Sequence, residues 1–284
     1  QQIQIADNYP GLLDGIIPSA TFPEVLATTQ FLTDIQLFDR YFKSTAHGMT
    51  EDQQKAVSGV GTLKNITGIY KGAQRVNPMT FCPPELPEAL RYHPIKNPTG
   101  ARCDVFDHTV NVYGVDPATG FARRPLDNVG IQYGLNALKM KQISMQQFLD
   151  LNEKIGGYDN DGDMVSARSR ADLNAVRAAY QTGRITNGGG GLASVPIIDF
   201  RAYTDLTKNG DVHLKYHSFA FRERLRLANR NSSNEFMLTA PTGTVSNQVI
   251  GYAIDKMSEW LTNVQKDQSG DPLRDKVIRA KPAD

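Results

Sequence analysis

The chain has 284 residues, a formal net charge of +1 and a mean hydropathy of −0.40. This length accommodates one large domain or two smaller ones. The near-neutral charge, with a pI near 7.9, provides no bulk field that would attract nucleic acid or an anionic membrane, so we expect no nucleic-acid partner. No apolar run approaches the roughly 18 residues of a membrane helix, so we expect no membrane span either.

The first residues predict a short helix followed by a strand. Residues 1–7 have the pattern of a helix end, and Asn-Tyr-Pro-Gly at 8–11 stops that helix. The apolar stretch 12–19 predicts a buried strand of a parallel sheet, for which only 195–203 and 235–239 are good partners. Three strands do not make a sheet covered on both faces. We therefore expect the rest of the sheet on a segment N-terminal to Gln1.

The region between residues 23 and 190 is mainly helical in its pattern. Helices are expected at 23–42, from 51 onward, and at 127–141, 144–152 and 172–183. Capping-box or N-cap side chains precede four of these helices: Thr50, Asp127, Ser144 and Asp172. Residues 76–125 are rich in proline and predict an ordered loop region with a hairpin around Thr109–Tyr113.

The C-terminal third returns to alternating strands and helices. A helix is expected at 216–229, between the two later strands, and an amphipathic helix at 245–265. The charged tail 266–284 is expected to lie over the surface. The predicted fold class is therefore α/β, with a parallel sheet interrupted by a large helical cap.

The predicted domain boundaries result from that order of elements. Residues 1–22 form the first part of the sheet core, residues 23–190 form the cap, and residues 191–284 complete the core.

The two cysteines, Cys82 and Cys103, both lie in loop-like sequence rich in proline and glycine. A disulfide between them would close a loop of about twenty residues and stabilise the chain by about 3 kcal/mol. The alternative is a pair of reduced thiols in a cytosolic protein. We expect the disulfide, which favours a secreted or periplasmic location. No Cys/His spacing indicates a zinc site.

The strongest candidate for chemistry is the loop after the second strand, which contains Asp205, Asp211 and His213, with His217 just beyond it. In open α/β sheets, ligands collect outside the carboxyl ends of the strands. An aspartate with a histidine a few residues later can form the orienting acid and the base of a nucleophilic triad there. The alternative is that the aspartates cap a turn and both histidines lie on a solvated helix face.

The segment 156–163 (Gly-Gly-Tyr-Asp-Asn-Asp-Gly-Asp) offers Asp159, Asp161 and Asp163 as oxygen ligands for calcium. An EF-hand loop counted from Asp159 would need a glutamate at its twelfth position, where the chain has Arg170. A structural turn is the stronger expectation, and no other cofactor is indicated.

Two further features have both a functional and a structural interpretation. The four glycines at 188–191 are either a hinge, which we favour, or backbone donors to an oxyanion. Arg123, Arg124 and Asp127 are either lining residues of a substrate pocket or, more simply, solvated or paired arginines beside a helix N-cap.

Residues 8–17 (Asn-Tyr-Pro-Gly-Leu-Leu-Asp-Gly-Ile-Ile) resemble the stretch just after the nucleophile elbow in tannase and feruloyl-esterase-like α/β hydrolases. The likeness is closer to a family of uncharacterised secreted bacterial α/β hydrolases. It extends through most of the chain, at 82–86, 121–130, 155–159, 199–205 and 211–213. The resemblance implies that the serine precedes Gln1 and that Asp205 is the triad acid.

The histidine departs from the pattern of these relatives. The usual base comes after the last strand, and no histidine comes after residues 236–243. We therefore predict His213 as the base, with His217 as second choice. The predicted function is a secreted serine hydrolase of small-molecule carboxylic esters or amides, whose partner is an N-terminal fragment of the same precursor. The alternative is a non-catalytic α/β-hydrolase-like binding module, with calcium as its potential ligand.

Overall fold

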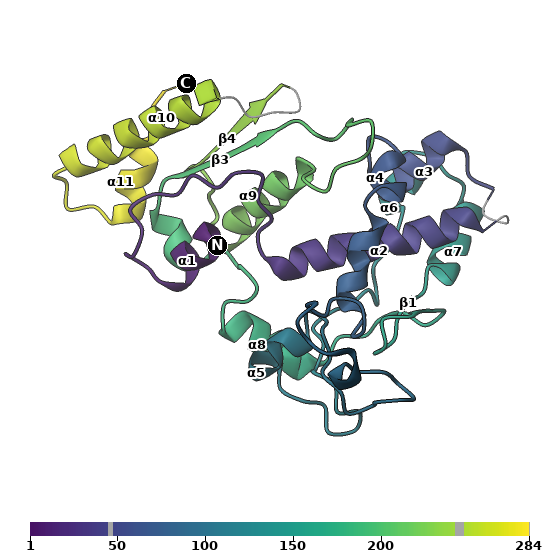
Figure 1. The fold of residues 1–284 in the computed structure, drawn as a ribbon. Helices are drawn as coiled ribbons and strands as arrows, with labels where there is room; N and C mark the ends of the chain where they lie inside the picture. Colours follow the sequence, from purple (N-terminus) through teal and green to yellow (C-terminus); the bar gives the residue numbers. More distant parts are fainter. Residues whose placement is uncertain (45–47, 242–246, 284) are drawn as a thin grey trace. The chain divides into compact units, whose positions relative to one another are not determined.

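The computed structural model describes residues 1–44, 48–241 and 247–283 (Figure 1). Its contacts divide the chain into two units. The sheet unit contains residues 1–27, 183–206 and 212–284, and the helical unit contains residues 28–182 and 207–211. The division into a core of residues 1–22 and 191–284 and a cap of residues 23–190 stays a prediction.

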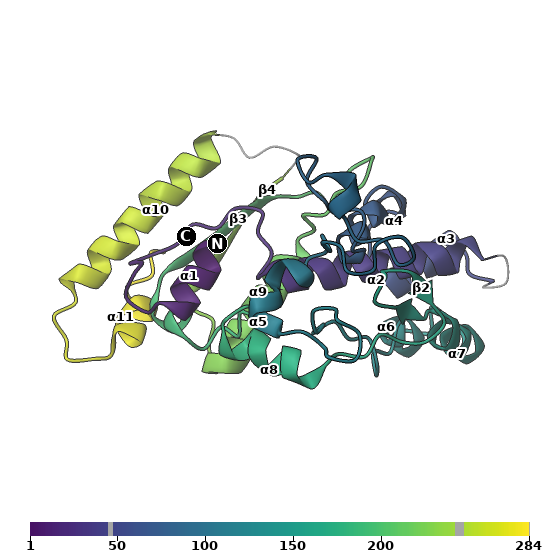
Figure 2. The same cartoon turned by 60° about the horizontal axis from the view of Figure 1, so that its bottom comes forward.

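The sheet unit is built on two parallel strands, β3 (Ile197–Ala202) and β4 (Glu235–Ala240), whose register pairs Ile197 with Glu235 (Figure 2). The expected first strand runs along the other side of β3. Ile16 N donates to Pro196 O at 3.0 Å, and Phe200 N donates to Pro18 O at 3.0 Å. The three predicted segments therefore do pair in parallel. The first does so through isolated bridges, because Pro18 lacks the N–H that a continuous ladder requires.

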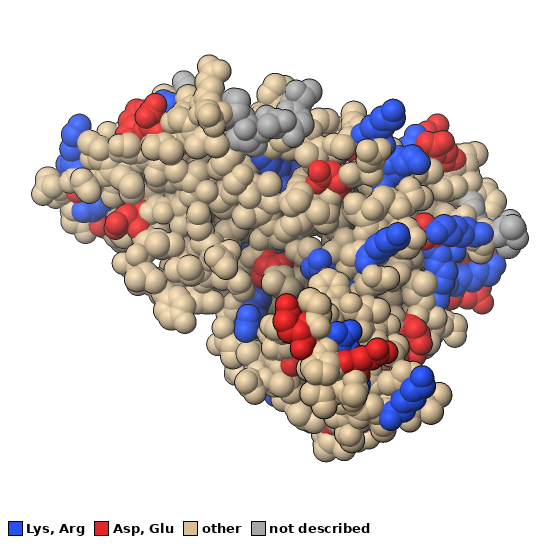
Figure 3. All heavy atoms as spheres, viewed as in Figure 1, with Lys and Arg blue, Asp and Glu red and all other residues tan. Residues whose placement is uncertain are grey.

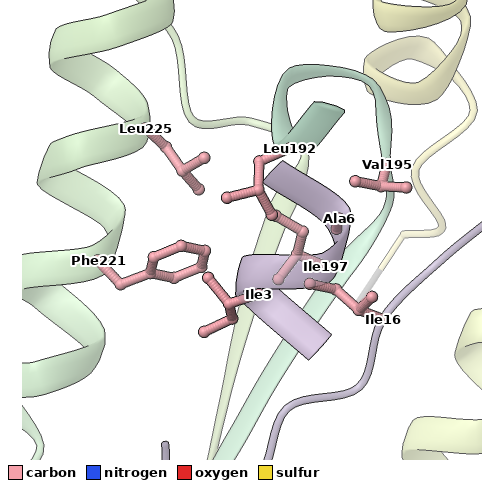
Figure 4. Packing of buried hydrophobic residues seen from close by; sticks show 8 residues of the cluster. All are labelled: Ile3, Ala6, Ile16, Leu192, Val195, Ile197, Phe221 and Leu225. Carbon is pink, nitrogen blue, oxygen red and sulfur yellow. The ribbon is translucent and has the colours of Figure 1, made fainter. Parts of the chain in front are cut away.

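Helices cover both faces of these strands. On one face, α1 (Gln2–Asn8), α9 (Tyr216–Asn229) and the 3₁₀ turn η4 (Gly191–Ser194) enclose Ile197. The side chains of this cluster point toward one another in Figure 4: Ile3, Ala6, Ile16, Leu192, Val195, Ile197, Phe221 and Leu225. Successive strand residues point to opposite faces, so the neighbouring Ile198 belongs to the other layer.

The opposite layer is formed by α10 (Asn247–Lys266) and α11 (Leu273–Arg279). Trp260 is 1% exposed, packs in one cluster with Ile198, and donates its indole N–H to Val277 O at 2.8 Å. The tail that was expected to lie over the surface contains the helix α11, whose Val277 is buried. Of the helix predicted from residue 245, the first two residues lie outside the described residues.

The helical unit consists of short helices joined by loops. Its helices are α2 (Val25–Lys43, starting in the sheet unit), α3 (Glu51–Ser58), α4 (Lys64–Thr67), α5 (Val110–Tyr113), α6 (Leu135–Lys139), α7 (Met145–Lys154) and α8 (Leu173–Gln181). It also contains the 3₁₀ helices η1 (Tyr70–Val76), η2 (Glu88–Leu90) and η3 (Asp107–Thr109), and an antiparallel pair β1 (Gly157–Tyr158) and β2 (Met164–Val165).

Three of the four expected helix starts are confirmed. Complete capping boxes begin α3 at Thr50 and α7 at Ser144, and Asp172 accepts from Asn174 N and Ala175 N at the start of α8. The prediction that a helix starts at Asp127 is wrong. Its carboxylate accepts instead from Val129 N at 2.6 Å and from Ala171 N at 2.8 Å.

The positive φ angles of Gly130 (82°) and Gly134 (79°) explain why the helix expected over 127–141 shortens to α6. The expected hairpin at Thr109–Tyr113 is also wrong. This stretch forms the end of η3 and all of α5, and the Thr109 hydroxyl donates to Val105 O, just before η3, at 2.7 Å.

The disulfide between Cys82 and Cys103 is present, with a Cα–Cα distance of 4.8 Å. It closes a separation of 21 residues within the loop region of the helical unit. A disulfide is consistent with an extracellular location. Among the helices described, none combines the length and the apolar composition that crossing a membrane requires.

Candidate functional site

The loop after β3 is closed at its two ends by hydrogen bonds within the sheet unit. The Thr204 hydroxyl donates to His213 O at 2.8 Å, and Lys215 N donates to the Asp205 carboxylate at 2.9 Å. Since β3 and β4 are parallel, this loop lies at the carboxyl edge of the sheet, where ligands of open α/β sheets collect.

Asp205 is oriented by the start of α9. Its Oδ1 accepts the Lys215 amide, and its Oδ2 lies 4.0 Å from Lys215 Nζ. The side chain keeps 17% of its surface exposed. By bonding a backbone amide, this carboxylate closes the loop, which is the turn-capping contact of the structural interpretation.

His213 is half-buried, and its ring lies 5.5 Å from the Phe22 ring between centroids. Its carbonyl accepts from Thr204 Oγ1 and, at 3.4 Å, from Arg201 Nη1. The backbone of the predicted base is therefore held from two directions, while part of the residue reaches solvent.

His217 is buried, with 1% of its surface exposed, so it does not lie on a solvated helix face. Its Nε2 lies 3.2 Å from Val212 O, and because a carbonyl only accepts, Nε2 carries the proton. Burial, reinforced by the charge of Arg201, lowers the pKa of His217 to about 3. The imidazole is neutral at physiological pH, and its ring packs edge-on against Phe22 at 4.2 Å.

The sequence predicted no role for Arg201. It is a buried charged residue of β3 that binds the backbone of this loop. It is 2% exposed and donates to Leu214 O at 2.9 Å and to Thr21 O at 2.8 Å. Burial lowers the pKa of the Arg201 guanidinium and raises that of Asp199, which lies 3.8 Å away. The signal in the sequence was a pair of opposite charges, Asp199 and Arg201, in an otherwise apolar strand.

The predicted pocket residues Arg123, Arg124 and Asp127 lie in the helical unit and make structural contacts there. Arg123 pairs with the helix-capping Asp172 at 2.5 Å. Arg124 donates to two backbone carbonyl oxygens of the 159–160 turn, at 3.0 and 2.6 Å. Their role in substrate binding stays a prediction.

The three aspartates proposed for calcium belong to the turn between β1 and β2. Asp159 Oδ1 accepts from Asp161 N at 3.0 Å and from Asp163 N at 2.9 Å, and Tyr92 donates its hydroxyl to Asp161 at 2.6 Å. Across the part of the chain that the structure describes, no group of three or more histidine, cysteine or acidic side chains is arranged to hold a metal. The contacts are those of an Asx-type turn.

The glycine run at 188–191 surrounds the end of α1. Gly188 N and Gly190 N donate to the two carboxylate oxygens of Asp7, at 3.2 and 2.8 Å. A Cβ on Gly190 would lie 2.1 Å from Asp7 O, and one on Gly191 would lie 2.1 Å from Ala6 O. Close approach to the backbone thus accounts for these two glycines, and two of the amides are already bonded to a side chain.

The charges of the face shown in Figure 3 are interspersed, with basic and acidic side chains next to one another and no large patch of one sign among the described residues in view. This agrees with the net charge of +1.

The comparison with known protein families gives a match over the whole chain. Residues 1–284 match the family model described as a tannase-like family of unknown function (DUF6351). A search of curated proteins and a search of solved structures each found no match. The full-length match confirms the resemblance drawn from residues 8–17 and the later motifs. The chain belongs to the tannase-like family of unknown function.

Proposed function

We propose that this chain carries the acid and base of a secreted serine hydrolase with an α/β-hydrolase-like fold, which cleaves carboxylic esters or amides. The observation that carries the proposal is the loop after β3, which is closed so that Asp205 and His213 come from its two ends. The tannase-like family is the second support, because it suggests an esterase-like hydrolase.

The proposed fold is supported by the layers of the sheet unit. Parallel segments at 16–20, 197–202 and 235–240 have helices on both faces. α1 leads into the first of these segments, in the order expected just after a nucleophile elbow. In the proposal, the serine therefore lies on a segment that precedes residue 1. The disulfide supports the secreted location.

The proposed chemistry is a two-step acyl transfer. The serine Oγ attacks the carbonyl carbon of the substrate while His213 accepts the serine proton. The tetrahedral intermediate collapses, the C–O or C–N bond breaks, and His213 returns the proton to the leaving alcohol or amine. Water then attacks the acyl-enzyme with the same base, releasing the carboxylic acid and restoring the serine. Asp205 holds the imidazole tautomer and stabilises the imidazolium.

The choice of His213 over His217 rests on their surroundings. The low pKa of His217, about 3, makes it a poor proton acceptor, and its Nε2–H is committed to Val212 O. His213 keeps partial access to solvent.

The proposal can be tested with a fluorophosphonate probe, which labels activated serines. The protein is expressed together with the segment that is proposed to precede residue 1. Labelling at a serine of that segment is expected. His213→Ala should slow it by about 100-fold or more, and Asp205→Asn should slow it to a similar extent. His108→Ala is the matched control, because His108 is exposed in η3 of the helical unit and should leave labelling unchanged.

Two outcomes contradict the proposal in different ways. Labelling that survives His213→Ala would move the base to another residue. No labelling, combined with a melting temperature that rises on addition of calcium, would favour the binding module.

A further inference from the structure

Arg201 is a charged side chain placed where the strand pattern calls for an apolar one. It lies in β3, whose residues 197–202 are all buried. Side chains alternate along a strand, so Arg201 shares the face of Ile197 and Asp199, which is the face covered by α9. A guanidinium that is 2% exposed is uncommon unless its donors are used.

Two of the three guanidinium nitrogens of Arg201, Nη1 and Nη2, bind backbone carbonyls from two segments far apart in sequence. Nη1 donates to Leu214 O at 2.9 Å and to His213 O at 3.4 Å, and Nη2 donates to Thr21 O at 2.8 Å. The planar fork of arginine suits this task, because its nitrogen atoms project in fixed directions, whereas a lysine ammonium is a point charge on a flexible stem.

Each of these carbonyls belongs to or adjoins a residue of the candidate site. Thr21 precedes Phe22, whose ring lies 5.5 Å from the His213 ring and 4.2 Å from the His217 ring. Leu214 precedes Lys215, whose amide bonds Asp205. One guanidinium therefore connects the segment that contains Phe22 to the segment that contains the predicted base, His213.

Stability alone is a weak reason for this arrangement. The counter-charge, Asp199, lies 3.8 Å away and is equally buried. Buried ion pairs are often no better for stability than apolar residues of similar volume, and their attested use is to specify one geometry. The geometry specified here is that of the loop carrying Asp205 and His213.

We infer that Arg201 is a positioning residue for the acid–base loop, acting through the carbonyls of His213, Leu214 and Thr21 without touching the substrate. The catalytic consequence rests on the proposed hydrolase function, whereas the effect on the position of His213 does not. The two parts can therefore be tested separately.

The first test monitors the His213 imidazole by NMR in Arg201→Lys and Arg201→Gln. Lysine keeps the positive charge but lacks the planar arrangement of donors of the guanidinium. Glutamine lacks the charge and most of the donors. We expect changed His213 ring shifts in both variants. Arg222→Lys is the control, because Arg222 bonds Glu235 and none of these carbonyls, and it should leave the His213 signals in place. Unchanged His213 signals in folded Arg201 variants would overturn the inference.

The second test uses ester hydrolysis by the active protein. We expect kcat to fall by about 10- to 100-fold in Arg201→Lys while KM stays within about threefold, because misplacing a catalytic group affects the chemical step more than binding. A melting temperature that falls without any change in kcat would mean a merely structural role and would overturn the inference. Absence of hydrolysis in the unsubstituted protein would instead contradict the proposed function, and the NMR test would still decide the role of Arg201.

A third measurement needs no substitution and covers the case in which the variants do not fold. If both ends of the fork are bonded, rotation about the Nε–Cζ bond of Arg201, which interchanges Nη1 and Nη2, is hindered, and separate slowly exchanging Nη1 and Nη2 signals are expected. A single averaged signal would contradict the two-segment attachment.

Discussion

Glu235, at the start of β4, should make the stability of the protein depend on pH. Its side chain has no exposed surface, and burial raises its pKa from the ordinary value of 4.5 to about 7, against the opposing hydrogen bond from Arg222 at 2.8 Å. The charge of Asp199 acts in the same direction as burial, and that of Lys281 acts against it. Glutamine at this position has a similar shape and does not titrate.

The sign and the size of the effect come from proton linkage. Between pH 4.5 and about 7, Glu235 is protonated in the folded state and ionised in the unfolded state, so unfolding releases a proton and stability falls as pH rises. The contribution of protonated Glu235 to the free energy of unfolding is present in full below pH 4.5 and is lost by about pH 7. At about 1.4 kcal/mol per pH unit, the loss is about 3 kcal/mol.

Urea unfolding between pH 4.5 and 7.5 measures this contribution. The unfolding free energy of Glu235→Gln minus that of the unsubstituted protein should rise by about 3 kcal/mol across the range, because the subtraction removes other titrating groups such as His217. Glu153→Gln, at an exposed position of α7, is the control and should give a flat difference. A flat difference for Glu235→Gln would refute the argument from burial.

The remaining predictions concern the covalent and backbone constraints. Replacing Cys82 and Cys103 by serine should lower the unfolding free energy by about 3 kcal/mol in non-reducing urea titrations, and an unchanged midpoint would mean that the bridge does not constrain the unfolded chain. Gly190→Ala should cost about 1–3 kcal/mol, because the new Cβ meets Asp7 O at 2.1 Å, whereas Gly270→Ala meets nothing within 4 Å. Equal thermal shifts for the two alanine variants would contradict the close approach.

Local signals explain the parts of the fold that the sequence predicted well. The capping boxes at Thr50 and Ser144 each involve a partner three residues away, so nearby residue types specify them. The bounds of α9 and the parallel pairing of β3 with β4 also agree with the prediction, because apolar periodicity reflects which face is buried.

The errors arise where a partner lies far away in sequence. Asp127 looked like a helix cap, but one of its oxygen atoms bonds Ala171 N, 44 residues away. α11 looked like an exposed tail because its sequence is charged, and its single buried valine is recognisable only once Trp260 is placed against it.

The candidate site, too, was predicted only in part from the sequence. The sequence alone placed Asp205, His213 and His217 in or beside one loop after a strand, because the order of residues along the chain decides which side chains lie just beyond the end of a strand. Only the tertiary structure decided that His217 is buried and neutral and that Arg201 binds the loop. Burial and desolvation depend on all the atoms packed around a group, and the Thr21 carbonyl that Arg201 binds is 180 residues away, beyond the reach of any local pattern.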